Sequence, residues 1–179
     1  MNVIIRNMTI NDCESFCKIV TLGWNQNYQG IVNDTFLKSL IDNEPERIIN
    51  TKNNFSEFKD NTLILEVDSK VVGFAKYGMS DYKGYQNSGE LNSIYIIEGY
   101  KGLGYGKKLF MSIIEKLLEK GYKDMIVGCL DKNKSNGFYI HLGGEKIGTQ
   151  IIKRGSQDLL ENIYYFKDLK TTKETLWNS

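Results

Sequence analysis

The chain has 179 residues with 23 Lys and Arg against 22 Asp and Glu, so its formal net charge is only +1. Such a balance gives no bulk attraction to nucleic acid or to an anionic membrane, and we expect neither as a partner. A hydrophobic content of 41% indicates a folded globule and excludes a disordered chain. From this length we expect one domain over residues 1–170, followed by a polar tail at 171–179.

Hydropathy and cysteine usage suggest a compartment. No run of about 18 apolar residues is present, and the first residues lack the apolar core and cleavage site of a secretory signal. The three cysteines form no even framework, which favours free thiols and a cytoplasmic location. Cys13 and Cys17 lie one helical turn apart. With a single His and one distant Cys129 they lack the partners of a zinc site, so we expect no metal.

The first half of the chain is expected to combine helices with strands. Its predicted elements are a strand at 3–6, a helix from Asn11 or Asp12 to about Asn27, a second helix at about 33–41, and a hairpin with strands at 63–67 and 71–77. The polar segment 41–60, which holds the only proline, is interpreted as helix ends and a surface connection.

The second half indicates strand, helix and strand in succession. A strand is predicted at about 90–97, and an amphipathic helix with apolar residues at helical spacing then runs to Gly121. A strand at 125–127, a short helix at 133–142 and strands at 146–152 and 162–166 follow. Early hairpins with later strand–helix–strand units predict an α/β (α+β) fold, a mixed sheet with helices on its faces.

The most informative stretch lies between the predicted strand and the amphipathic helix. Gly102, Gly104 and Gly106 alternate there, and Lys101, Lys107 and Lys108 surround them. Glycines let a ligand approach the backbone, and the first N–H groups of a helix point outward with the positive end of the helix dipole behind them. The pattern therefore predicts an anion site, most often one for phosphate or pyrophosphate.

Two common phosphate motifs do not match this turn. The ATP/GTP loop needs Gly, four residues and then Gly-Lys-Ser/Thr, but Gly106-Lys107 is followed by Lys108 and position 101 is Lys. The dinucleotide fingerprint needs a glycine three residues after Gly104, where Lys107 stands.

The turn resembles motif A of the GNAT superfamily of acyl-CoA N-acyltransferases, which has Gln or Arg, two residues, Gly, one residue and Gly or Ala after a long strand. Lys101, Gly104 and Gly106 match it, although Lys replaces the planar donor of the family. The segment 133–144 is similar to the family's later helix, with an Asn before a Phe-Tyr pair and a Leu-Gly-Gly end. Two further stretches, 24–31 and 161–169, extend the resemblance to about residues 3–169.

The resemblance implies a single-domain fold with a mixed, mostly antiparallel sheet and helices on both faces. It also implies an N-acetyltransferase that moves the acetyl group of acetyl-CoA to a primary amine by direct attack in a ternary complex. The acceptor is then a small-molecule or peptide amine, and a homodimer is a family expectation. The alternative is a non-catalytic acyl-CoA-binding or sensor protein on the same fold.

The chemistry of that reaction points to two candidate residues. An alkyl amine with a pKa near 10.4 is only about 0.04% neutral at pH 7, so the enzyme needs a proton acceptor beside it and a way to neutralise the departing thiolate. In some members of the family a glutamate at the position that corresponds to Glu90 is a general base; an amine-binding anion and a solvent-facing charge remain alternative interpretations. It places a phenol near the sulfur at a position that corresponds to Tyr139, for which core packing is the alternative.

The resemblance also assigns binding residues. Those expected at acetyl-CoA are Ile94, Tyr95 and Ile96 through their backbone, then Lys101, Gly102, Leu103, Gly104, Tyr105, Gly106 and Lys107, and finally Asn133, which is also a candidate helix cap. Trp24 and Tyr28, together with Glu90, are expected at the acceptor, where aromatic faces and a carboxylate suit a cationic amine. Helix core is the alternative role for the two aromatic residues.

Overall fold

The computed structural model describes residues 2–178, so Met1 and Ser179, the outer ends of the expected domain and tail, lie outside the described residues. The chain divides into two compact units. Unit 1 contains the residues up to Lys76 together with Ser93–Leu109, and unit 2 contains Tyr77–Asn92 and the residues from Phe110 on. Strands β3 and β4 and helix α4 contribute residues to both.

The strands form a sheet with the hydrogen-bonded order β1-β2-β3-β4-β5-β7-β6. Their bounds are β1 Val3–Asn7, β2 Thr62–Val67, β3 Lys70–Met79, β4 Gly89–Ile96, β5 Met125–Leu130, β6 Glu145–Arg154 and β7 Gln157–Phe166. The β4–β5 pair is parallel, whereas β1–β2, β2–β3, β5–β7 and β6–β7 are antiparallel. The predicted fold class, a mixed and mostly antiparallel sheet with helices, is confirmed.

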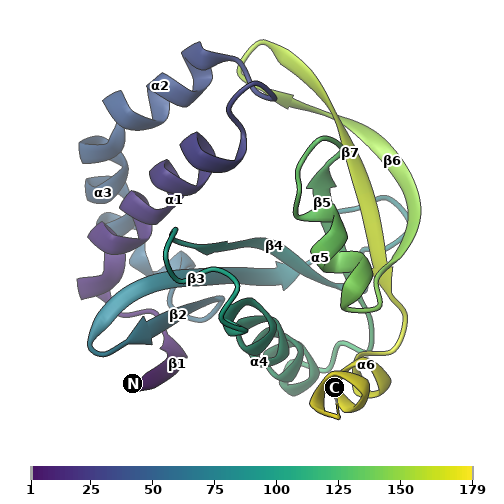
Figure 1. The fold of residues 1–179 in the computed structure, drawn as a ribbon. Helices are drawn as coiled ribbons and strands as arrows, with labels where there is room; N and C mark the ends of the chain where they lie inside the picture. Colours follow the sequence, from purple (N-terminus) through teal and green to yellow (C-terminus); the bar gives the residue numbers. More distant parts are fainter. Residues whose placement is uncertain (1, 179) are drawn as a thin grey trace. The chain divides into compact units, whose positions relative to one another are not determined.

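Unit 1 packs helices against the first strands. Helices α1 (Cys13–Asn27), α2 (Asp34–Asp42) and α3 (Glu44–Asn53) lie together beside β1–β3 (Figure 1). A buried apolar cluster joins α1 to β2 and β3, and in it the ring of Phe16 in α1 lies 4.4 Å from that of Phe74 in β3. Burial of this apolar surface is the main favourable contribution to the folding of the unit.

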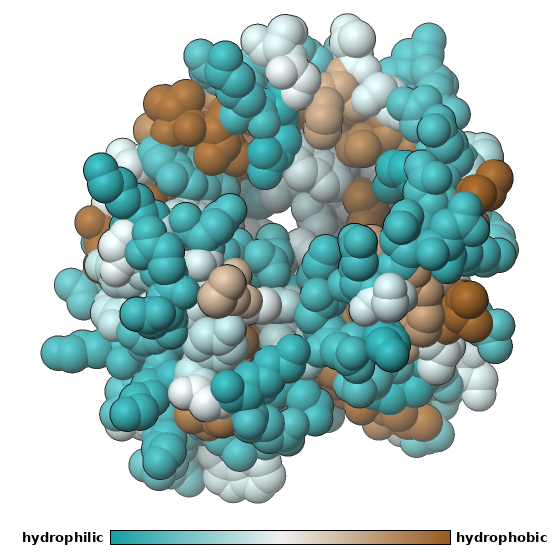
Figure 2. Space-filling model, turned by 180° about the vertical axis from the view of Figure 1, so that it is seen from behind, coloured by the Kyte–Doolittle hydropathy of each residue, from teal (hydrophilic) through white to brown (hydrophobic). Residues whose placement is uncertain are grey.

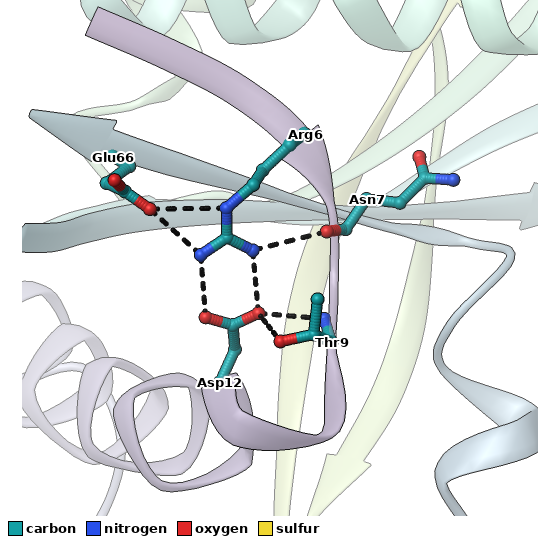
Figure 3. Close-up of polar contacts among 5 residues, drawn as sticks. All are labelled: Arg6, Asn7, Thr9, Asp12 and Glu66. Atoms are coloured by element: carbon teal, nitrogen blue, oxygen red, sulfur yellow. Dashed lines mark hydrogen bonds and ion pairs between the residues drawn. The ribbon is translucent and has the colours of Figure 1, made fainter. Parts of the chain in front are cut away.

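A buried polar contact fixes the start of α1 (Figure 3). The guanidinium of Arg6 in β1 donates to both oxygens of Asp12, at 2.7 and 2.9 Å, and also to Glu66 in β2 at 2.9 Å. The same carboxylate accepts from the backbone and hydroxyl of Thr9. Asp12 thus ends the short 3₁₀ turn Ile10–Asp12 and ties the beginning of α1 to the sheet.

Unit 2 has its own aromatic core. In α4 (Tyr105–Glu119), Phe110 lies 5.1 Å from Phe166 of β7 and 6.3 Å from Phe138 of α5 (Asn136–His141). Helix α6 (Leu169–Trp177) buries Leu169 and Leu176, and its Lys173 pairs with Glu115 of α4 at 2.8 Å.

Figure 2 shows that polar side chains cover most of the face opposite to Figure 1, with separate hydrophobic areas between them.

Three segments differ from the sequence-based expectation. Helix α3 lies within 41–60, which was interpreted as helix ends and a surface connection. Helix α6 includes most of the expected polar tail, and β7 begins at Gln157 instead of 162. In each case tertiary contacts supply what the local pattern lacks, as with Thr51 of α3, which is buried against Cys17 of α1.

Candidate functional site

The glycine turn adopts the backbone that only glycine accepts readily. Gly102 and Gly104 have φ of 75° and 79°, and α4 begins at Tyr105, directly after them. A Cβ built at either glycine would meet no heavy atom within 4 Å, so the turn faces open space. Gly106 is the second residue of α4 and is not among the glycines with a left-handed φ. The turn therefore has the construction of an anion cradle at a helix N-terminus.

Lys101 is engaged within unit 1. Its ammonium lies 3.0 Å from a carboxylate oxygen of Glu98 and donates to Oδ1 of Asn27, at the end of α1, over 3.2 Å. These contacts hold the glycine turn against α1. An anion at the turn would meet a lysine that is already positioned, with a charge shared with Glu98.

The end of β4, which belongs to unit 1, packs closely against β3 and α1. At Gly73 of β3, a Cβ would lie 2.6 Å from the carbonyl oxygen of Tyr95, and at Gly23 of α1 it would overlap the Tyr95 ring. The two glycines thus allow Tyr95 to lie between β3 and α1. The side chain of Tyr95 is therefore used for packing, and the contact expected with the cofactor concerns the backbone of Ile94–Ile96.

Trp24 lies in the last turn of α1, and Tyr28 follows the helix directly. Their rings are 4.5 Å apart, and the Trp24 ring lies 5.3 Å from that of Phe36 in α2. All three side chains are half-buried. The cluster joins the two helices and still offers ring surface to solvent.

Glu90 lies near the start of β4 in unit 2 and is half-buried. Burial raises the pKa of its carboxyl, and the charges of Asp81 and Glu161 add to this. Hydrogen bonds from the Asn92 amide, at 2.7 Å, and from the backbone of Asp81 act in the opposite direction. The net direction is upward, which brings the carboxylate closer to the proton affinity that a general base needs near neutral pH.

Tyr139 lies in α5 and is buried. Its ring is 5.5 Å from Phe138 and 5.8 Å from Tyr164 of β7. The packing role proposed as an alternative for this residue is thus present. This packing is compatible with chemistry at the hydroxyl, because a ring held by its neighbours also holds its hydroxyl oxygen in one position.

Glu90 and Tyr139 belong to opposite faces of the sheet in unit 2. Glu90 pairs with Ile126 of β5, whereas Tyr164, which contacts Tyr139, pairs with the next residue, Val127. Side chains alternate between the faces along a strand, so Glu90 and Tyr139 are on either side of β5. Gly89–Leu91 of β4 pair with Met125–Val127 of β5, and both strands continue beyond these residues.

Asn133 does not cap α5. The helix begins at Asn136, and the Asn133 side chain accepts from the Ser135 N–H at 2.9 Å in the turn before it. The residue that anchors the helix is Asn136, which sequence reasoning missed. Its amide donates to the Leu130 carbonyl at 2.8 Å, and its oxygen accepts from the Tyr164 hydroxyl at 2.7 Å. The Asn-Gly before the Phe-Tyr pair was the available signal.

Cys129 of β5 is buried, and burial together with the charge of Glu161 raises the pKa of its thiol to about 12. At neutral pH such a thiol contains very little thiolate, the nucleophilic form. A covalent route through Cys129 therefore has no support in the structure.

A comparison with protein-family models decides the family. The model described as "Acetyltransferase (GNAT) family" matches residues 14–143, which is most of the chain. The chain belongs to the GNAT acetyltransferase family. It is thus an acyltransferase, and the resemblance based on the glycine turn and the segment 133–144 is confirmed.

Similar proteins of known sequence or known structure match nearly the whole of this GNAT chain. The uncharacterized N-acetyltransferase YuaI of Bacillus subtilis (strain 168) is 27% identical over 185 residues, covering 97% of this chain and 98% of that protein. The PaiA N-acetyltransferase of Thermoplasma acidophilum, solved with coenzyme A, has a TM-score of 0.66 and 19% identity, covering 90% of this chain and 98% of that one. The putative acetyltransferase yncA of Salmonella typhimurium, solved with acetyl-CoA, has a TM-score of 0.62 and 20% identity, covering 93% and 94%.

Within residues 2–178, no group of three or more His, Cys, Asp or Glu side chains is arranged to hold a metal ion. Over the same residues, no helix is both long and apolar enough to cross a membrane.

Proposed function

We propose that this GNAT enzyme transfers the acetyl group of acetyl-CoA to a primary amine by direct attack in a ternary complex. The observation that carries the proposal is the pair Glu90 and Tyr139, a carboxylate of raised pKa on one face of the sheet and a buried phenol on the other. A proton acceptor on one side and a proton donor on the other are what attack by an amine and departure of a thiolate require.

The glycine turn and the N-terminal turn of α4 would hold the pyrophosphate of acetyl-CoA. Gly102 and Gly104 provide the open, left-handed backbone that a phosphate group can approach, and the helix dipole favours its charge. The backbone of Ile94–Ile96 would pair with the amides of the pantetheine arm. The PaiA and yncA structures, which contain coenzyme A and acetyl-CoA, support a coenzyme A ligand for this fold.

The acceptor would enter as an ammonium ion and give one proton to Glu90. The neutral nitrogen then attacks the thioester carbonyl carbon, a C–N bond forms and the C–S bond breaks. Tyr139 gives its proton to the leaving thiolate and is reprotonated, through solvent, by the second proton lost from nitrogen. The products are the N-acetyl amine, free coenzyme A and one proton released to solvent.

The rings of Trp24, Tyr28 and Phe36 favour a cationic acceptor, since aromatic faces attract ammonium groups. A cytoplasmic location and a homodimer stay predictions; the free thiols of Cys13, Cys17 and Cys129 suit a reducing compartment.

Direct transfer is tested by mass spectrometry of the protein after incubation with acetyl-CoA and no amine. We expect the mass of the protein to stay unchanged, and thiol release to begin only when a primary amine is added. An acetylated protein would contradict direct transfer. A protein stabilised by coenzyme A against heat, and not by ATP or NAD, but releasing no thiol with any amine would instead be the non-catalytic acyl-CoA sensor.

A further inference from the structure

Glu161 of β7 is a buried carboxylate that the reaction as described does not use. It is 8% exposed, and its Oε2 accepts from the Tyr82 hydroxyl at 3.0 Å and from the Gln150 amide at 2.8 Å. Within the described part of the chain, none of the ion pairs formed by Lys or Arg involves Glu161. A buried charge without a cation is a poor source of stability, so its presence calls for another explanation.

Strand register places Glu161 on the face that carries Glu90. Glu161 pairs with Leu130 of β5, and Glu90 pairs with Ile126, so both share the face of the even-numbered residues of β5. Gly128 lies between these positions. A Cβ there would be 2.7 Å from Oε1 of Glu161 and would overlap the Tyr82 hydroxyl. The absence of a side chain at Gly128 thus gives Glu161 and Tyr82 their place on this face.

Tyr82 connects Glu161 with the surroundings of Glu90. It lies in the segment between β3 and β4, whose ends are joined by a hydrogen bond from the Ser80 N–H to the Ser88 carbonyl at 3.0 Å. The neighbouring residue, Asp81, donates its backbone N–H to the Glu90 carboxylate. The Tyr82–Glu161 hydrogen bond, between residues 79 positions apart, therefore holds this segment where Asp81 meets Glu90.

We propose that Glu161 is a positioning residue for acetyl transfer, which anchors the Tyr82 segment beside Glu90 and places an unneutralised negative charge on the same face of the sheet. This inference rests on the proposed function, in which Glu90 accepts the proton of the acceptor amine. A like charge nearby disfavours the ionised form of Glu90 and so favours the state that exists after the proton has been accepted.

Charges from two elements act on Glu90. Titratable side chains near it are Asp81 and Tyr82 from the β3–β4 segment and Glu161 from β7, and the facing positions of β5 are Ile126 and Gly128. Asp81 is exposed, so water screens its charge, whereas Glu161 is buried. Glu161→Gln keeps the size of the side chain and removes one of these charges, so it tests the effect of charge on Glu90 with little change in shape.

The test is a pH titration of the Glu90 carboxyl by ¹³C NMR in the full chain labelled at glutamate, with the Glu90 signal assigned by its loss in Glu90→Gln. We expect Glu161→Gln to lower the pKa of Glu90 by roughly 0.5–1 unit, the size of a like-charge effect across a partly buried site. Gln150→Lys, which keeps Glu161 and neutralises it, should shift the pKa in the same direction. Tyr82→Phe keeps the charge of Glu161 but loosens the hydrogen bond from Asp81 to Glu90. It should therefore raise the pKa of Glu90.

Asp158→Asn is the matched control, since it removes one carboxylate from the same strand but on the opposite face, and it should leave the Glu90 titration unchanged. An unchanged titration in both Glu161→Gln and Gln150→Lys would overturn the inference, as would a shift of the same sign in Tyr82→Phe. Because the titration needs no turnover, its outcome is separate from that of the proposed function. Where an amine acceptor is turned over, the acidic limb of kcat/KM should move with the NMR value.

Discussion

The ring of Tyr95 lies against Gly23 in α1, in the place that a side chain at position 23 would occupy. Helix propensity alone predicts that Gly23→Ala stabilises the chain by about 0.5–1 kcal/mol. Steric overlap with a ring packed against β3 predicts a loss of about 1–3 kcal/mol. We expect the overlap to dominate, since Tyr95 also contacts Phe74, with ring centres 5.5 Å apart.

Chemical denaturation of Gly23→Ala, Tyr95→Leu and the double variant measures the effect of this overlap on the free energy of unfolding. The double variant should be more stable than the sum of the single changes predicts, because the smaller side chain removes the overlap. Displacement of Tyr95 should also raise the KM for acetyl-CoA in Gly23→Ala. Strict additivity of the two changes would show that the contact has no energetic importance.

Glu90→Gln removes the proposed proton acceptor. Glu90 works in its ionised form, so kcat/KM should fall as the pH drops through its pKa, at a pH above the ordinary value of 4.5 for a glutamate because burial raises that pKa. In Glu90→Gln this acidic limb should disappear and kcat should fall by about 10²–10⁴-fold. Glu119→Gln, at an exposed position in α4, should keep the acidic limb and the original kcat. A pH profile of Glu90→Gln that keeps its acidic limb would rule out the base.

Tyr139→Phe removes only a hydroxyl from a ring packed between Phe138 and Tyr164. We expect a free energy of unfolding within about 1.5 kcal/mol of the original, a lower kcat and little change in the KM for acetyl-CoA. Initial rates and denaturation of the same sample measure both quantities, with Tyr122→Phe, in the turn after α4, as the control. Normal turnover in Tyr139→Phe would remove its role as the proton donor.

Gly104→Ala should weaken acetyl-CoA binding. Its φ of 79° lies in the left-handed region, where a side chain costs about 1–2 kcal/mol, so the turn should relax away from the conformation that accepts a phosphate. Gly148→Ala in β6, where an added Cβ meets no heavy atom within 4 Å and φ is ordinary, is the matched control. Calorimetry with coenzyme A should show the loss in Gly104→Ala alone; equal affinities would place the pyrophosphate elsewhere.

The Arg6–Asp12 contact should make stability depend on acid pH. Burial alone would raise the pKa of Asp12, but hydrogen bonds from Arg6 and Thr9 lower it below its ordinary value of 3.8. A lowered pKa in the folded state means that this stability is present above the ordinary value and is lost as the pH falls through the folded value. Asp12→Asn should therefore cost about 1–3 kcal/mol at pH 7 and much less at the acid end. Urea denaturation across that pH range measures the difference in the free energy of unfolding between the two chains. A difference that stays constant at all pH values would contradict the proposed effect of the Arg6–Asp12 contact.

The sequence predicted the glycine turn and α4 because both depend on local rules, the left-handed backbone of glycine and the helical spacing of apolar residues. It failed at α3, whose segment has few apolar residues and depends on contacts with α1 and α2, such as Arg47 with the Leu40 carbonyl at 2.8 Å. Pro45, in the first turn of α3, was a signal that favours a helix start. Asp168, which accepts from the Lys170 and Thr171 N–H groups, was the corresponding signal for α6.

The candidate site was predicted in part for a similar reason. Glu90 and Tyr139 stand in recognisable motifs, whereas Glu161 gains its surroundings only when β7 extends back to Gln157 and brings it opposite Gln150. The charged and polar residues of 157–161 hide that extension. Its stability comes from pairing with β6 and β5, which no local pattern encodes.

The central claim, acetyl transfer to an amine, is tested most directly with acetyl-CoA labelled in the acetyl carbons and a panel of primary amines that includes diamines, amino acids and peptide N-termini. Mass spectrometry of the amines gives the amount of label in each. We predict that at least one amine acquires the label much faster with the original chain than with the double variant Glu90→Gln and Tyr139→Phe. Coenzyme A binding without labelling of any amine, or equal labelling by the double variant, would contradict the account.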